Sequence, residues 1–162
     1  MQPNDQARQE LLQTVAGLSD EDLNRKPADD RWSIKQVMEH LYLMEGAIAK
    51  TISHQLKNGE TVNAEAKPIE ATTNRDVKVV APDFATPTGD FATLAELEQK
   101  LAASHDMLKQ VAEEADEADL EAKAYPHPMF GPMSLKQWIP FVGYHEMRHT
   151  AQIEEVKEQL GL

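Results

Sequence analysis

Four long stretches of the chain carry apolar residues at the three- and four-residue spacing of an α-helix that buries one face. They cover approximately residues 4–17, 33–57, 93–114 and 134–161, and the segments between them are rich in Pro, Gly, Thr and Asp. Amphipathic helices of this length bury their apolar faces most readily against one another. The sequence therefore predicts an all-α fold, a four-helix bundle.

Local signals mark several ends of these helices. Ser33 and Ser134 each precede an apolar run and are followed three residues later by Gln36 and Gln137, the pattern of a capping box. Gly161 follows the last periodic segment, where a glycine commonly ends a helix. We therefore expect these helices to begin and end close to those residues.

The connection between the second and third helices is unusually long for a compact bundle, at about 35 residues. It contains Pro68, Pro82, Pro87 and Gly89, which disfavour a further long helix. We expect a long loop that covers part of the bundle as a lid. Short apolar pieces such as residues 77–80 could add a little extended structure, but nothing indicates a sheet.

The size of the chain favours one domain. Its 162 residues, of which 41% are hydrophobic, are enough for one core, and a second domain would be cramped. We therefore expect residues 1–162 to form a single four-helix-bundle domain.

Charge and composition exclude several partners. The 28 acidic residues outnumber the 16 basic ones, giving a formal net charge of −12 that repels nucleic acids and anionic lipids. The N-terminus lacks the pattern of a signal peptide, and no apolar run is long enough to span a membrane. We expect a soluble cytoplasmic protein with a small-molecule substrate, and neither nucleic acid nor membrane as a partner.

The chain has no cysteine. It can therefore form neither a disulfide nor a thiolate ligand, and any sulfur chemistry would require an external thiol.

Three histidines suggest a metal site. His145 and His149 are four residues apart, so in a helix they lie on one face and can share an ion. Both fall on the apolar face of the last helix, and His40 lies at the flank of the apolar face of the second helix. Divalent sites that do chemistry usually have about three protein ligands and one open position, and His40 is the natural third ligand.

Other interpretations of the histidines stay open. A buried histidine is often only a hydrogen-bonded core residue, and His105 or His127 could also approach the metal.

The letters His145-Glu146-x-x-His149 also match the metallopeptidase motif HExxH, in which the glutamate is the general base. Gln152 occupies the glycine position of the extended form of that motif, and too few residues follow for a downstream glutamate ligand. A peptidase is therefore a minor alternative.

Several motifs in this order resemble the DinB/YfiT-like superfamily of metal-binding four-helix bundles. They are the stretch from Leu23 to Pro27, the stretch from Trp32 to Val37 followed by His40-Leu41, residues 127–133, and His145-x-x-x-His149 followed by Gln152-Ile153. The resemblance covers nearly the whole chain.

The resemblance implies an up-down-down-up bundle, expected as a homodimer, that holds one divalent ion with His40, His145 and His149. Similar proteins include thiol-dependent transferases that use bacillithiol, mycothiol or glutathione, and others described as metal-dependent hydrolases. Zinc and nickel are both plausible ions, because three neutral imidazoles do not choose between them.

A three-histidine site could activate either a low-molecular-weight thiol, for transfer, or a water molecule, for hydrolysis. Gln152 is a candidate partner of a ligand imidazole or of bound solvent, and Glu146 is a candidate base. A bundle that binds a metal or a partner without catalysis is the remaining alternative.

Overall fold

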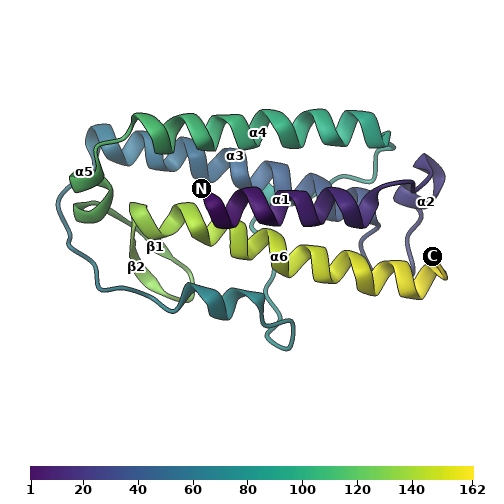
Figure 1. Cartoon of the computed structure of the whole chain (residues 1–162). Helices are drawn as coiled ribbons and strands as arrows, with labels where there is room; N and C mark the ends of the chain where they lie inside the picture. The colour runs from purple at the N-terminus through teal and green to yellow at the C-terminus, as the bar shows by residue number, and fades with distance from the viewer.

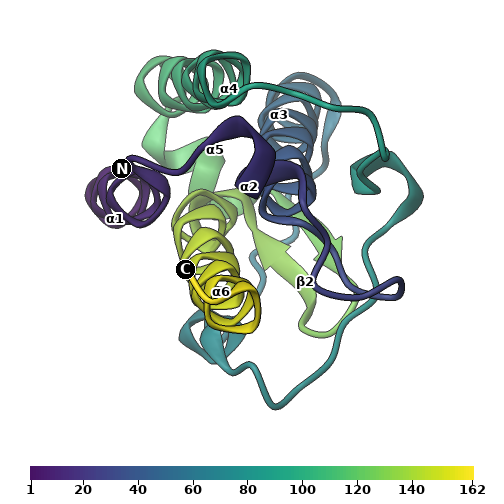
Figure 2. The same ribbon diagram turned by 90° about the vertical axis from the view of Figure 1, so that its right-hand side faces the viewer.

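The computed structural model describes all 162 residues, and four long helices dominate it (Figure 1). They are α1 (Gln2–Val15), α3 (Ile34–Asn58), α4 (Leu94–Glu114) and α6 (Leu135–Leu160). α1 and α6 run in one direction, whereas α3 and α4 run in the other, so the topology is up-down-down-up (Figure 1). Viewed along their axes, the four helices occupy the corners of a bundle (Figure 2). The prediction of an all-α four-helix bundle with this topology is confirmed.

The helix ends follow local chemistry. Ser33 caps α3 in a complete capping box with Gln36, and Thr93 and Glu96 form a second box at the start of α4. Gly161 ends α6 in the left-handed conformation that favours glycine, with φ 74°.

The predicted box at the start of α6 is only half formed. The Ser134 hydroxyl accepts from the amide of Gln137, but the Gln137 side chain bonds both backbone groups of Lys67 instead of reaching back. The Gln137 side chain therefore ties the long connection to α6 and does not complete the capping box.

Six short elements join the long helices. They are α2 (Asp20–Asn24), the 3-10 helices η1 (Ile69–Thr73) and η2 (Asp83–Ala85), α5 (Glu117–Ala122), and the strands β1 (Ala124–His127) and β2 (Gly131–Ser134). α5 forms within the acidic segment of residues 113–121 because Asp116 caps the helix and Leu120 is buried beneath it.

β1 and β2 pair as an antiparallel hairpin just before α6, a small sheet that the sequence did not indicate. Pro126 and Pro132 lower the strand propensity of these two segments, but contacts with α6 support their pairing. The Trp138 indole Nε1–H donates to the Tyr125 carbonyl at 3.0 Å and its ring packs on Tyr125. Gly131, with φ 70°, supplies the backbone conformation at the turn.

The apolar core is divided into two clusters along the bundle axis. One lies toward the end containing Leu11 and Ile153, and the other toward the end containing Ile52 and Leu135. Buried polar side chains, among them Arg8 and Glu45, occupy the middle of the bundle between the clusters. No helix is both long and apolar enough to cross a bilayer.

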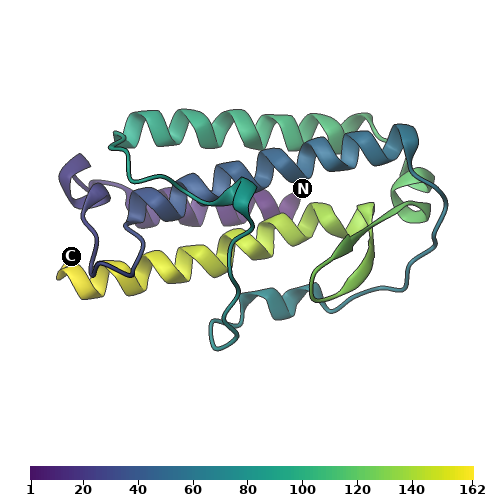
Figure 3. The same cartoon turned by 180° about the vertical axis from the view of Figure 1, so that it is seen from behind.

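The long connection between α3 and α4 runs across the face formed by α3 and α6 (Figure 3). Arg148 of α6 fastens it, donating to the backbone carbonyls of Thr72 at 3.2 Å, Asn74 at 2.6 Å and Val77 at 2.5 Å. Arg75 adds a two-point ion pair with Glu155, at 3.0 Å for each contact. The loop is thereby held as a cover over the middle of the bundle.

Candidate metal centre

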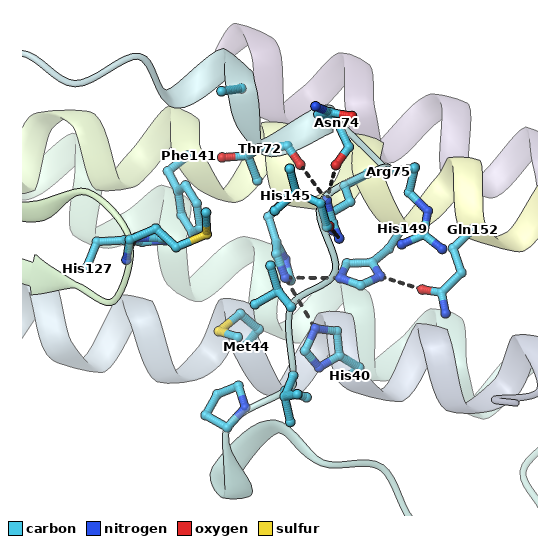
Figure 4. A pocket seen from close by; sticks show the side chains of 18 of the residues that line it. His40, Met44, Thr72, Asn74, Arg75, His127, Phe141, His145, His149 and Gln152 are labelled. Atoms are coloured by element: carbon cyan, nitrogen blue, oxygen red, sulfur yellow. Dashed lines mark hydrogen bonds between the residues drawn. The ribbon is translucent and has the colours of Figure 1, made fainter. Parts of the chain in front are cut away.

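His40 of α3 and His145 and His149 of α6 bring their imidazoles together beneath this cover (Figure 4). The Nε2 atom of His145 lies 3.2 Å from Nε2 of His40 and 3.2 Å from Nε2 of His149. One ligand atom from each residue lies within 4.8 Å of the others. The separation of four residues in α6 places two rings on one face, and the packing of α3 on α6 supplies the third.

The partners of the opposite ring nitrogens determine which atoms face the centre. His40 Nδ1–H donates to the carbonyl of Ala85, and His149 Nδ1–H to Oε1 of Gln152, both at 2.7 Å. In the neutral rings, Nε2 of both residues therefore carries a lone pair rather than a proton. Nε2 of His145 can carry at most one proton, so it can donate a hydrogen bond to only one of the two neighbouring Nε2 atoms. A cation among the three rings could instead be bound by all three Nε2 atoms. The residues present fit a divalent metal ion.

Burial keeps these rings neutral. His40 is 2% exposed and His145 and His149 are 8% exposed. Desolvation is the main reason that the pKa of each ring falls below its ordinary value, well below it for His145 and to about 3 for His149. Neutral imidazole is the form that binds metals, so no proton has to be displaced at neutral pH.

A cavity of about 450 Å³ opens onto the three histidines. Trp32, Met44 and Phe141 form apolar parts of its wall, and Trp32 packs on the His40 ring with centroids 5.3 Å apart. In Figure 4, His127 and Phe141 lie on one side of the histidine group and Gln152 on the other. The centre is therefore buried in protein yet open to a small molecule.

Glu146 lies elsewhere. Its carboxylate is paired with Arg8 at 2.9 Å and is absent from the lining of the cavity. Arg8 also pairs with Glu45 at 2.9 Å, so the glutamate belongs to the buried ionic layer of the bundle. This pairing directs the Glu146 carboxylate to Arg8 rather than into the histidine cavity.

The two remaining candidate histidines stay outside the group of three. His105 bonds Asp5 at 2.8 Å and Glu45 at 3.4 Å, which ties α4 to α1 and α3. His127 lines the cavity, but its Nδ1 accepts the backbone amides of Met129 at 3.0 Å and Phe130 at 3.2 Å.

The sequence did not reveal the roles of two groups that support the site, the Ala85 carbonyl and the Arg148 side chain. The Ala85 carbonyl, which orients His40, belongs to η2 in the long connection, and no side-chain pattern announces a backbone acceptor. Arg148 fastens the cover through three carbonyls, whereas the sequence offered only its charge.

Comparison with known families agrees with this geometry. Residues 4–153 match the model of the DinB superfamily. This chain belongs to the DinB superfamily. Over 155 residues, 96% of this DinB chain and 95% of the relative, it is 34% identical to the uncharacterised protein YuaE of Bacillus subtilis. It is also 26% identical over 154 residues, 94% of the chain and 79% of the relative, to a Geobacillus kaustophilus protein named "Putative metal-dependent hydrolase GK0616".

Solved structures share the DinB fold of this chain. YfiT from Bacillus subtilis, described as a probable metal-dependent hydrolase with an unusual four-helix bundle topology, superposes with a TM-score of 0.62 at 19% identity, covering 99% of this chain and 85% of YfiT. The four-helix bundle protein TT2238 superposes with a TM-score of 0.66 at 18% identity, covering 95% and 94% of the two chains.

Proposed function

We propose that this DinB-superfamily protein is a metal-dependent enzyme for a small molecule, with His40, His145 and His149 as the ligands of one zinc or nickel ion. The observation that carries the proposal is the convergence of three imidazole nitrogens, two of them fixed as lone-pair donors by Ala85 and Gln152. When bound, a divalent ion there acts as a Lewis acid that lowers the pKa of a thiol or water at its open position.

The chain's own residues prepare the site. Gln152 and the Ala85 carbonyl orient two of the rings, so that few side-chain motions must be lost when a ligand binds. The connection fastened by Arg148 covers the face that carries the three largely buried rings, and burial strengthens electrostatic interactions among them.

Transfer of an external low-molecular-weight thiol is the leading reaction. Asp30 is the only carboxylate residue that lines the cavity, and Glu146 is occupied by Arg8, so the histidines have no evident general base beside them. A thiol has an ordinary pKa much closer to neutrality than water and needs less help to ionise. The chain has no cysteine that could compete for the ion.

Hydrolysis is the second candidate. The names of GK0616 and YfiT support it, and a dication can itself make water nucleophilic near neutral pH. A bundle that binds metal without turnover is the conclusion if the experiments below detect no reaction. The peptidase alternative requires Glu146 as its general base, but that carboxylate is paired with Arg8.

The ligand assignment is tested by metal analysis of protein purified without a metal-affinity column. Wild type should retain close to one zinc or nickel per chain, and His40→Ala, His145→Ala and His149→Ala should each lose most of it. The matched control is His54→Ala, an exposed histidine on α3. Full metal in His145→Ala would overturn the assignment.

The nucleophile is tested with cobalt-substituted protein. Addition of bacillithiol, mycothiol or glutathione should produce a sulfur-to-cobalt charge-transfer band if a thiol is the co-substrate. If no thiol gives the band while ester or amide substrates are hydrolysed, the enzyme is a hydrolase. If neither occurs, the non-catalytic alternative holds.

A further inference from the structure

A second hollow of about 590 Å³ lies beside the histidine cavity, between α3, the β1–β2 hairpin and the long connection. Both hollows are lined by Met44, His127, Phe141 and His145, so they are two arms of one cavity. We call the second hollow the apolar arm. Its volume falls within the range, roughly 300–1,000 Å³, that accommodates small organic ligands.

The apolar arm contains no acidic residue, lysine or arginine, although 27% of the chain is charged. Ile48, Ile52 and Leu135 line its depth, and Trp138 has its only polar atom occupied by the Tyr125 carbonyl. The histidine arm differs, since Arg31, Arg75 and Arg148 line it. A charged group would lose its hydration in the apolar arm without gaining a partner.

The mouth of the apolar arm is also apolar. Five of the ten exposed large hydrophobic residues of the protein line this hollow, and three of them also line the histidine arm. The five are Val79, Val80, Phe84, Tyr125 and Met129, of which Val79, Val80 and Met129 are shared. A contiguous group of exposed apolar side chains, of which Val80 is 92% exposed, is typical of a ligand-binding surface.

His127 supplies one directional group where the two arms meet. Its Nδ1 accepts two backbone amides of the hairpin turn, so the proton of the neutral ring is on Nε2. Nε2 has no partner within the protein and is not a buried unsatisfied atom. It is a fixed hydrogen-bond donor that a ligand can use.

From these features we infer that the apolar arm binds the uncharged aliphatic or aromatic group of the substrate, and that His127 Nε2–H donates to an acceptor atom, such as a carbonyl oxygen, next to that group. The inference rests on the proposed function for the reaction at the histidines, but binding in the arm does not require the ion.

The location is tested by titrating metal-free protein with acetylnaphthalene, a neutral aromatic ketone, and following its binding by calorimetry. Ala47 lines only the apolar arm and is partly exposed, so Ala47→Leu fills the arm without disturbing the core. It should weaken binding by about tenfold, since the added side chain occupies the volume of the ligand. The matched control is Ala103→Leu on the exposed face of α4, which should bind as wild type does.

The donor is tested by comparing acetylnaphthalene with ethylnaphthalene, which has the same shape and no acceptor. Wild type should prefer the ketone by about tenfold, the value of one net hydrogen bond. His127→Asn keeps an acceptor for the turn amides but lacks Nε2–H, so the preference should disappear while ethylnaphthalene still binds. His54→Asn is the control.

Three outcomes would overturn the inference: unchanged ketone binding in Ala47→Leu, an unchanged preference in His127→Asn, or tighter binding of anionic naphthoate than of the ketone. A shift in oligomeric state of Ala47→Leu during gel filtration would instead identify the arm as a contact between two copies. Because these titrations use metal-free protein, their failure is independent of the metal analysis, which tests the proposed function.

Discussion

Gln152 is the residue outside the three histidines on which the geometry of the site depends most directly. Its Oε1 accepts the Nδ1–H of His149 at 2.7 Å, which orients the ring and fixes its tautomer. Such partners of metal-binding histidines typically contribute a factor of about 10–100 to metal affinity.

Gln152→Leu should therefore lower zinc affinity by about 10–100-fold, because the ring loses its orienting acceptor. Gln152→Glu should preserve the affinity, since a carboxylate also accepts the proton. Competition with a chromophoric chelator measures both constants, and Gln110→Leu on α4, an exposed position, is the control. Equal affinities in wild type and Gln152→Leu would contradict this role.

Arg8 is the residue on which we expect the free energy of unfolding to depend most directly, because it neutralises two buried carboxylates. It is buried and lies between the carboxylates of Glu45 and Glu146, and it also donates to the Leu101 carbonyl at 2.7 Å. A buried ion pair that loses one partner leaves an uncompensated charge in a medium of low dielectric constant.

Arg8→Met should reduce the free energy of unfolding by about 3–5 kcal/mol, measured by urea denaturation, because two buried carboxylates lose their cation. Glu146→Gln should cost less, and it should leave metal content unchanged, because the pair lies outside the cavity. A large loss of metal in Glu146→Gln with an unchanged fold would return Glu146 to the functional site.

Among the four long helices, α4 contributes no residue to the histidine cavity, and a polar residue secures its position. His105 bonds Asp5 of α1 and Glu45 of α3. The hydrogen bond to Glu45 is the largest cause that raises the pKa of His105 above its ordinary value of 6.5, with a further contribution from Asp5. The charged imidazole therefore stabilises the packing of three helices.

The raised pKa predicts a dependence of stability on pH. The contribution of His105 should be fully present below the ordinary value of 6.5 and lost as the pH rises through the raised pKa of the folded state. In metal-free protein, the free energy of unfolding should therefore fall above pH 6.5, and less so in His105→Gln. Urea denaturation at a series of pH values measures the difference, and parallel profiles for the two proteins would rule this contribution out.

For the whole molecule, the site joins the two antiparallel helices α3 and α6 in the middle of the bundle, where the core is polar. An ion bound only by the folded protein stabilises it by mass action. The three ligands come from two helices, and His40 lies 105 positions from His145 in the sequence, so unfolding must separate them.

Zinc at about 100 times its dissociation constant should stabilise metal-free protein by about 3 kcal/mol, which corresponds to a rise in Tm of about 5–10 °C. Calorimetry measures the shift, and His145→Ala should show none because it lacks a ligand. The same rise in His145→Ala would mean that zinc acts at another place.

Much of the bundle could be predicted because its signals are local. The apolar periodicity and the Ser33–Gln36 box involve residues a few positions apart, and the structure contains the helices where they indicate. The spacing of His145 and His149 is local in the same sense, and a helix brings their rings together whatever surrounds it.

The remainder depends on distant partners. The hairpin was missed because its prolines weaken strand propensity, whereas contacts made only in the folded protein, such as the burial of Met133 and the bond from Trp138, support it. Glu146 faces Arg8 across 138 positions of sequence, an ion pair that no local pattern encodes. The adjacency of His127 to the histidine cavity likewise follows from the place of the hairpin on the bundle.

The sequence by itself determined the helices, their caps and the paired histidines of α6, because those features arise from interactions between near neighbours in the chain. The sequence also pointed to His40 as the third histidine, but only the tertiary structure brought it against the pair. Only the tertiary structure decided that Glu146 is committed to an ion pair and that an apolar arm adjoins the centre. These depend on how helices pack and where the connection crosses them, and packing is settled by the sum of many distant contacts.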